Sequence, residues 1–339
     1  MNQMQRIIDG AKSGSVKLVL PEGEDVRTLL AARELIDSEI AEVTLLGDIS
    51  VVQSTALDNR IDLKGVSIID PKSSEYENEF TDLAFDLLGE RGRTREEAAE
   101  EVKRAVNFGA LMVTSGKADA SVAGAVNTSA EVARAALLFI GLKKGTELLS
   151  SSFFMISPDG QKAYTFADCG VVPDPDPKQL AEIAVESAQS HKLLSGEQPK
   201  IAFLSFSTKG SAAHAKVEKV TEALEIARSI RPDLEMDGEF QFDAAVVAEV
   251  GKRKAPESAV AGEANVLIFP DLDSGNIAYK MAERLGGFTA LGPLLQGLKA
   301  PMHDLSRGCT SKDIVEVAAI AAFQSIMINV ESEAIYADL

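Results

Sequence analysis

The sequence has no tryptophan, two cysteines and three histidines among its 339 residues. Cys169 and Cys309 lie far apart and no CxxC pair occurs, which argues against a disulfide framework and against a structural zinc site. No stretch reaches the roughly 18 consecutive apolar residues of a membrane-spanning helix, and an acid, Asp9, precedes any apolar run at the N-terminus. We therefore expect a cytoplasmic protein that does not bind a membrane.

Basic residues are also few. The chain has 34 Lys and Arg against 52 Asp and Glu, a formal net charge of −18. Such a charge disfavours nonspecific attraction to nucleic acid, so we expect no nucleic-acid partner. With 45% apolar and 25% charged residues the composition is that of a folded protein, and the length is about twice that of a usual domain. The sequence therefore predicts two domains.

In the first half of the chain, short β-rich runs alternate with helical patterns. A helix is expected over residues 25–36, where apolar residues recur at helical spacing. Strands are expected at residues 16–20, 43–46, 66–69, 111–113 and 118–122. Strands that alternate with helices predict a mostly parallel sheet covered on both faces.

A second domain is expected to begin near residue 151. Apolar runs at 152–156 and 162–166 flank a Ser-Pro-Asp-Gly turn and predict a hairpin. Further strands are expected at 201–205 and 266–269, and helices at 179–189, 215–230 and 311–327. Because no low-complexity linker is visible, we expect the two domains to pack closely across a cleft.

Several well-known catalytic motifs are missing. No GxGxxG or GxxxxGK[ST] sequence follows a strand pattern, and GxSxG fails because Asp304 stands where the first glycine should precede Ser306. The three histidines, His191, His214 and His303, form no close pair. The sequence therefore gives no support to a nucleotide loop, a serine hydrolase or metal catalysis.

Three segments combine residue types that suit chemistry. Residues 205–211 form a hydroxyl-rich loop between a strand and a helix, where backbone N–H groups suit an anion, although N-capping serines explain it equally well. Residues 127–134 begin a helix that carries Arg134. This arginine suits binding of an anion, but it could also be an ordinary surface arginine. Residues 304–313 lead into the last helix, with Thr310 or Ser311 as its N-cap and Asp313 in its first turn; a helix-start preference alone accounts for that acid.

Taken together, the long motifs of this chain resemble the phosphate acetyltransferase (phosphotransacetylase) family. The similarity runs in order over essentially the whole chain. The motifs are FADC at 166–169, LSFSTKGS at 204–211, DGEFQFDAA at 237–245, FPDLDSGNIAYK at 269–280, GPLLQGL at 292–298 and DLSRG at 304–308. Six such motifs are far more specific than any one of the short patterns considered above.

The resemblance implies the reaction acetyl-CoA + phosphate ⇌ acetyl phosphate + CoA, by direct attack of the CoA thiolate in a ternary complex. It implies two α/β domains with a cleft between them, like the isocitrate and isopropylmalate dehydrogenases. Residues 1–148 with 294–339 would form the first, discontinuous domain and residues 149–293 the second. It further implies a homodimer, no metal and no prosthetic group, with coenzyme A as a substrate beside acetyl phosphate and phosphate.

The resemblance also suggests which residues act. The catalytic residues would be Asp313, Ser306 and Arg307. The substrate-binding arginine of the family would be Arg134. From the two segments described above, Thr128 and Ser129 at the start of its helix, and Ser207, Thr208, Lys209 and Gly210 in the hydroxyl-rich loop, are also expected to bind substrate. A further family arginine corresponds to Arg91 or Arg93, and the spacing does not decide between them. The chain departs from many relatives in having Asn127 where they have histidine.

A CoA thiol and a free aspartate differ in pKa by roughly 4.6 units, so proton transfer to Asp313 in water would be uphill by about 6 kcal/mol. We therefore expect thiolate stabilisation or concerted transfer, with Arg307 binding the phosphoryl group and Ser306 donating to the oxyanion. Because the substrates are anionic, a local basic pocket of Arg134, Arg307 and Lys209 is expected.

Two alternative functions stay open. A phosphate butyryltransferase-type acyltransferase would keep these loops and enlarge the acyl pocket. A noncatalytic acyl-CoA-binding protein would have no need for Ser306, Arg307 and Asp313, which are all present.

Overall fold

The computed structural model describes the backbone of residues 2–89 and 92–337, and their side chains up to residue 328 together with that of residue 330. The chain divides into two compact units, which are described separately. The first unit is Met4–Lys144 with the C-terminal stretch from Leu298 onward. The second unit is Gly145–Gly297 with residues 2 and 3.

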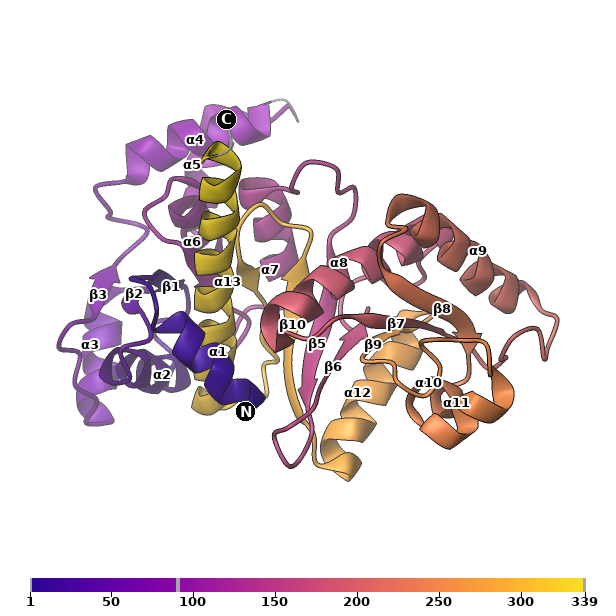
Figure 1. The fold of residues 1–339 in the computed structure, drawn as a ribbon. Coiled ribbons are helices and arrows are strands. Elements are labelled where there is room, and N and C mark those ends of the chain that lie inside the picture. Colours follow the sequence, from indigo (N-terminus) through magenta and orange to yellow (C-terminus); the bar gives the residue numbers. More distant parts are fainter. Residues whose placement is uncertain (1, 90–91, 338–339) are drawn as a thin grey trace. The chain divides into compact units, whose positions relative to one another are not determined.

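The first unit contains a five-stranded sheet in the order β11-β4-β1-β2-β3 (Figure 1). Its strands are β1 (Lys17–Leu20), β2 (Glu42–Leu46), β3 (Ser67–Ile69), β4 (Ala120–Val122) and β11 (Met302–His303). Its helices are α1 (Gln3–Ala11), α2 (Val26–Asp37), α3 (Ile49–Asp58), α4 (Glu77–Gly89), α5 (Arg95–Val102), α6 (Ala105–Thr114), α7 (Ser129–Ala135) with the π-helical turn η1 (Ala136–Ile140), and α13 (Ser311–Ala337). All neighbouring strands are parallel, as the alternation of strands and helices predicts.

The order of these strands reverses at β1. The chain runs from β1 outward to β2 and β3, whereas β4 and β11 lie on the other side of β1. Helix α13, yellow in Figure 1, packs against β4 and α2 through a face of small residues. That face includes Ala318, Ala319, Ala321 and Ala322, which are all fully buried. Because the strands are parallel, the loops after β11, β4 and β1 leave the same edge of the sheet.

One expected strand of the first unit is wrong. Residues 111–113 lie inside α6, and the strand that pairs with β1 is β4, at 120–122. Every residue from Val106 to Val113 is buried, so α6 shows no polar face. A helix that is apolar all round cannot be told from a buried strand by periodicity.

The second unit contains a six-stranded mixed sheet in the order β10-β5-β6-β9-β7-β8. Its strands are β5 (Ser150–Ile156), β6 (Ala163–Ala167), β7 (Lys200–Leu204), β8 (Glu235–Phe240), β9 (Val266–Ile268) and β10 (Thr289–Gln296). Its helices are α8 (Pro177–Ser195), α9 (Ala215–Ile230), α10 (Phe242–Val246), α11 (Ala248–Lys254) and α12 (Leu272–Gly286). The predicted hairpin is β5 and β6, which pair antiparallel.

Helices cover both faces of this second sheet. One apolar core joins the sheet to α8 and α9, and includes Leu180, Val220 and Phe203. The other joins the opposite face to α10 and α12, and includes Phe240 and Tyr279. Residues 294–296, which the sequence analysis assigned to the other domain, extend β10 because they pair with β5.

Candidate functional site

Three loops of the first unit meet at the carboxyl edge of its parallel sheet. Residues 21–25 follow β1, residues 123–128 follow β4, and residues 304–310 follow β11. The strand order reverses between β1 and β4, and open α/β sheets bind their ligands beside such a reversal. The second and third loops contain, or lead directly into, the sequence-predicted residues of this unit. The topology therefore brings the candidate catalytic residues to the usual ligand-binding edge.

Asp313 takes part in the N-terminal cap of α13. The Thr310 hydroxyl accepts a hydrogen bond from the Asp313 N–H at 3.2 Å, and Asp313 Oδ2 accepts from the Thr310 N–H and hydroxyl at 2.7 and 2.9 Å. Thr310 is thus the N-cap, one of the two residues expected. Asp313 Oδ1 has no protein donor within the described part of the chain, so it is the oxygen left to act on a ligand.

Ser306 and Arg307 lie on the exposed part of the loop before α13. The Ser306 hydroxyl accepts a weak hydrogen bond from the Gly308 N–H at 3.3 Å, and its own proton is left for another acceptor. The Arg307 guanidinium forms no ion pair with any side chain that the structure describes. Both side chains are therefore available to a ligand.

Arg27 is a site residue that the sequence analysis missed. Its guanidinium donates to the Arg307 and Cys309 carbonyls at 2.8 and 3.0 Å, and to the Ala125 carbonyl at 2.7 Å. It is held in turn by Asp25, the N-cap of α2, at 2.8 Å, and hydrogen bonds from Arg27 lower the pKa of Asp25. One side chain thus ties together the loops after β4 and β11.

Two further groups of the third loop are buried. Asp304 is 1% exposed, and its Oδ1 accepts no hydrogen bond from any residue that the structure describes. Burial raises the pKa of Asp304 to about 6, against the opposing hydrogen bonds from Ser129 and the Leu305 N–H. Burial likewise raises the pKa of the Cys309 thiol to about 11. At neutral pH Cys309 is therefore a neutral thiol and a poor nucleophile.

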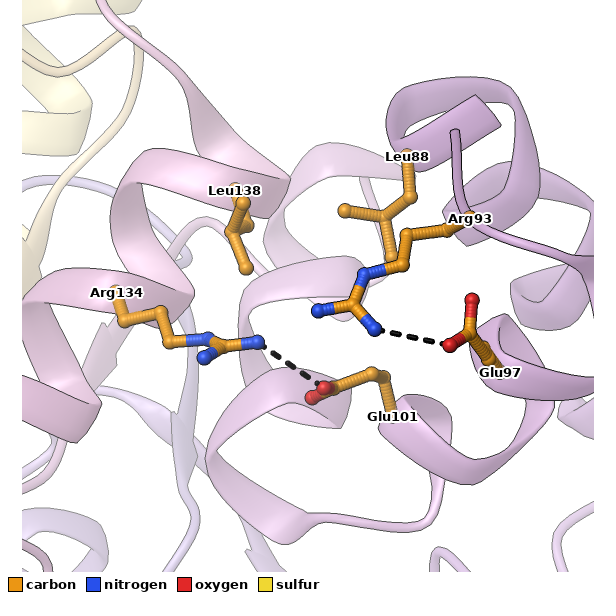
Figure 2. A pocket seen from close by; sticks show the side chains of 6 residues that line it. All are labelled: Leu88, Arg93, Glu97, Glu101, Arg134 and Leu138. Carbon is orange, nitrogen blue, oxygen red and sulfur yellow. Dashed lines mark hydrogen bonds and ion pairs between the residues drawn. The ribbon is translucent and has the colours of Figure 1, made fainter. Parts of the chain in front are cut away.

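Arg134 lines a pocket of about 410 Å³ on the first unit (Figure 2). Thr128 caps α7 in a capping box with Glu131, and Arg134 stands in the last turn of that helix. The side chain of Arg134 is 54% exposed and pairs with Glu101 at 3.2 Å. Arg93 reaches into the same pocket from the loop before α5. Leu88, Glu97 and Leu138 complete the lining.

The pocket brings two guanidinium groups together. In Figure 2 the side chains of Arg93 and Arg134 point toward each other across the cavity, while Glu97 and Glu101 lie along one side. Arg93 pairs with Glu97 at 3.0 Å. Of the two arginines left open by the sequence, Arg93 is therefore beside Arg134, and Arg91 lies outside the described residues. The sequence predicts that Arg307 and Lys209 share a basic pocket with Arg134. Neither of these two residues lines this pocket.

The 205–211 loop belongs to the second unit, and its polar groups bind one another. Ser207 is fully buried and donates to Glu239 at 2.7 Å, and the Gly210 N–H donates to the same carboxylate at 2.8 Å. Lys209 pairs with Asp237 at 2.5 Å. The N–H groups of residues 208, 209, 211 and 212 also donate within the unit. An anion would have to displace these bonds, so substrate binding by Ser207, Thr208, Lys209 and Gly210 stays a prediction.

Within the part of the chain that the structure describes, no group of three or more His, Cys, Asp or Glu side chains is placed to hold a metal ion. None of the described helices is long and apolar enough to cross a membrane.

Comparisons with known proteins agree with the motifs. Residues 2–322 match the model of the family described as phosphate acetyl/butaryl transferase. The phosphate acetyltransferase of Thermoanaerobacterium thermosaccharolyticum is 46% identical over 96% of this chain and all of its own length. A phosphotransacetylase structure from Streptococcus pyogenes has a TM-score of 0.90 and 41% identity, covering 96% of this chain and 98% of that one.

A more distant likeness concerns the fold. A putative 4-hydroxythreonine-4-phosphate dehydrogenase from Salmonella typhimurium has a TM-score of 0.53 at 11% identity, over 93% of this chain and 99% of that one. The relatives and the two α/β units confirm the predicted fold class, and the distant match agrees with its dehydrogenase-like character.

Proposed function

Because the chain belongs to the phosphate acetyl/butaryl transferase family, we propose that it transfers an acetyl group between coenzyme A and phosphate. The observation that carries this proposal is the loop before α13. It presents an exposed hydroxyl at Ser306, an unpaired guanidinium at Arg307 and a carboxylate oxygen at Asp313 within one short segment. The carboxylate can take the thiol proton, the hydroxyl can donate to the oxyanion, and the guanidinium can bind the phosphoryl group.

In the proposed mechanism the CoA thiol attacks the carbonyl carbon of acetyl phosphate in a ternary complex. Asp313 Oδ1 accepts the thiol proton, since Oδ2 is engaged by Thr310. Ser306 donates to the oxyanion of the tetrahedral intermediate. Arg307 binds the phosphoryl group through two parallel hydrogen bonds, a bidentate geometry that its planar guanidinium favours. Collapse of the intermediate breaks the carbon–oxygen bond and releases phosphate.

Asp313 alone is too weak a base for this step. A free aspartate and a free thiol differ by about 4.6 pKa units, which makes complete transfer uphill by about 6 kcal/mol. We therefore place proton transfer in concert with carbonyl attack, so that negative charge reaches the oxyanion rather than resting on sulfur. A covalent acetyl-serine route is disfavoured, because among the described residues no histidine bonds to Ser306.

The pocket of Arg93 and Arg134 is proposed to bind a phosphate group of coenzyme A. It offers two guanidinium groups that face each other. Arg93 and its partner Glu97 are 49% and 48% exposed, whereas Arg134 is 54% exposed and its partner Glu101 is 20% exposed. Exposed ion pairs are worth about 0–1 kcal/mol, so a phosphate can replace Glu97 as the partner of Arg93 at little cost, and the exposed guanidinium of Arg134 can bind the same phosphate. Arg93 would then be the second CoA-binding arginine. Thr128 and Ser129, which the sequence predicts to bind substrate, are included in this proposal as CoA contacts.

We propose a homodimer, for which α12 supplies an apolar surface. Ile277, Met281 and Leu285 recur every four residues on this helix and are 58%, 56% and 83% exposed. A stripe of large apolar side chains at this spacing suits packing against another helix. We further propose that the protein acts in acetate metabolism in the cytoplasm. That it needs no metal ion and no prosthetic group stays a prediction.

The test is the formation of acetyl-CoA from acetyl phosphate and CoA, followed by thioester absorbance, with propionyl and butyryl phosphate assayed beside it. Asp313→Asn is expected to abolish most of the activity. Glu218→Gln is the control, because Glu218 is also an acid in the first turn of a helix, α9, and lies outside the apolar stripe of α12. Preference for butyryl phosphate would make the protein a butyryltransferase. CoA binding without turnover of any acyl phosphate would refute the enzymatic proposal.

A further inference from the structure

The carboxylate of Glu22 lies at the carboxyl edge of the sheet, where the strand order reverses. Glu22 follows β1 and is 8% exposed. It accepts hydrogen bonds from the backbone N–H groups of residues 124, 125, 126 and 127, which follow β4, at 2.7 to 3.1 Å. The Asn127 amide donates to it as well, at 2.8 Å. Four consecutive N–H groups thus converge on one anion.

Successive backbone N–H groups that point to one spot form an anion-binding nest. In open α/β sheets such a nest at the strand reversal commonly holds an anionic group of a ligand. Here the protein supplies the anion itself. The loop after β4 is therefore shaped around an internal carboxyl group before any substrate arrives.

The fixed loop leads directly to groups assigned above to CoA. Asn127 is followed by Thr128, Ser129 and α7 with Arg134. The loop is also tied to the catalytic segment, because the Ala125 carbonyl accepts from Arg27, which holds the Arg307 carbonyl. At Gly124, with φ of +114°, an added Cβ would lie 2.3 Å from Asp304 Oδ1, so the two loops touch closely.

We propose that Glu22 is a positioning residue, whose carboxylate holds residues 124–127 so that α7 presents its CoA-binding groups at the right place. The assignment rests on the proposed function for its effect on CoA, but the loop contacts stand without it. Glutamine at position 22 keeps the size of the side chain. Its NH2 group faces N–H donors, so at least one bond of the nest is lost.

The experiment compares Glu22→Gln and Glu22→Ala with wild type. Glu182→Gln is the matched control, because Glu182 also accepts two consecutive backbone N–H groups, at 2.7 and 3.0 Å, in the second unit. The readouts are KM for CoA, KM for acetyl phosphate, kcat, and hydrogen exchange of a peptide spanning residues 120–128. Formate is added to the alanine variant, since a small carboxylate fits the vacated nest.

We expect Glu22→Gln to raise KM for CoA about tenfold, the effect of one lost charge-assisted hydrogen bond, with a smaller change in KM for acetyl phosphate. Exchange should quicken in the 120–128 peptide but not in α13, and formate should restore the alanine variant in a saturable way. A general loss of folded protein would lower apparent kcat without raising one KM, so this split separates positioning from stability.

An unchanged KM for CoA despite faster exchange would overturn the role in positioning. Unchanged exchange would overturn the claim that the carboxylate holds the loop. If wild type makes no acyl-CoA, the proposed function has failed by itself, and the exchange measurement still decides whether Glu22 holds residues 124–127.

Discussion

Asp304 allows a quantitative test of the first unit. The carboxyl is 1% exposed, its Oδ1 has no donor among the residues described, and Glu22 adds negative charge nearby. Burial raises its pKa from 3.8 to about 6 in the folded protein, which corresponds to about 3 kcal/mol of folding free energy. The perturbation is Asp304→Asn, which keeps the shape of the protonated carboxyl and removes the titration.

The sign follows from proton binding. Between pH 3.8 and 6 the folded protein holds the Asp304 proton and the unfolded chain has lost it. Ionisation in the fold therefore costs stability as pH rises, and the full cost is present above about pH 6. Relative to the asparagine variant, wild type should lose about 3 kcal/mol on going from below pH 4 to above pH 7, most of it between pH 4 and 6.

The assay is urea unfolding of both proteins at a series of pH values, monitored by circular dichroism and by tyrosine fluorescence, since the chain has no tryptophan. Asp58→Asn, an exposed change at the end of α3, is the control and should leave the pH profile unchanged. If the profiles of wild type and Asp304→Asn run parallel, the carboxyl is not strained by burial and the reasoning is refuted.

Three further predictions concern the pocket, the thiol and the dimer. Arg93→Gln and Arg134→Gln should each raise KM for CoA about tenfold, as expected for a lost charge-assisted bond, and equal KM values would remove the pocket from CoA binding. Cys309→Ser should keep near-wild-type kcat because the thiol, with a pKa of about 11, is neutral; loss of turnover at unchanged stability would contradict this. Met281→Glu should shift the sedimentation mass from dimer to monomer, whereas an unchanged mass would place the interface elsewhere.

Much of the fold was predictable where sequence periodicity is clear. The helix over α9 and the hairpin of β5 and β6 follow from local patterns, because each has one polar and one apolar face or a marked turn. Helix α6 was not predictable, because its burial on all sides removes the alternation of polar and apolar residues that marks a surface helix. The last helix runs to Ala337, ten residues beyond the predicted end, as no glycine or proline stops it.

The candidate site divides in the same way. Thr310 and Asp313 were predictable because a capping box is a local motif of four residues. Glu22 binds backbone amides 102 to 105 residues away, and Arg27 binds carbonyls 98 to 282 residues away. No short sequence motif contains both the side chain and the backbone groups that it binds. The one local signal was Asp25, an N-cap two residues before Arg27.

These long-range bonds give the loop after β1 a particular task. This loop places an anion, Glu22, on the N–H groups of the second loop, and the first turn of α2, which follows it, places a cation, Arg27, on carbonyls of the second and third loops. Most of these bonds go to backbone groups, with the Asn127 amide as a further partner of Glu22, so the two side chains fix the shape of the loops. The proposed chemistry and substrate binding fall to Ser306, Arg307 and Arg134, which are exposed and can take an anionic substrate as a partner. Because Glu22 and Arg27 satisfy the polar backbone groups of these loops, Arg307 and Arg134 are not needed to hold the loops and can bind the ligand.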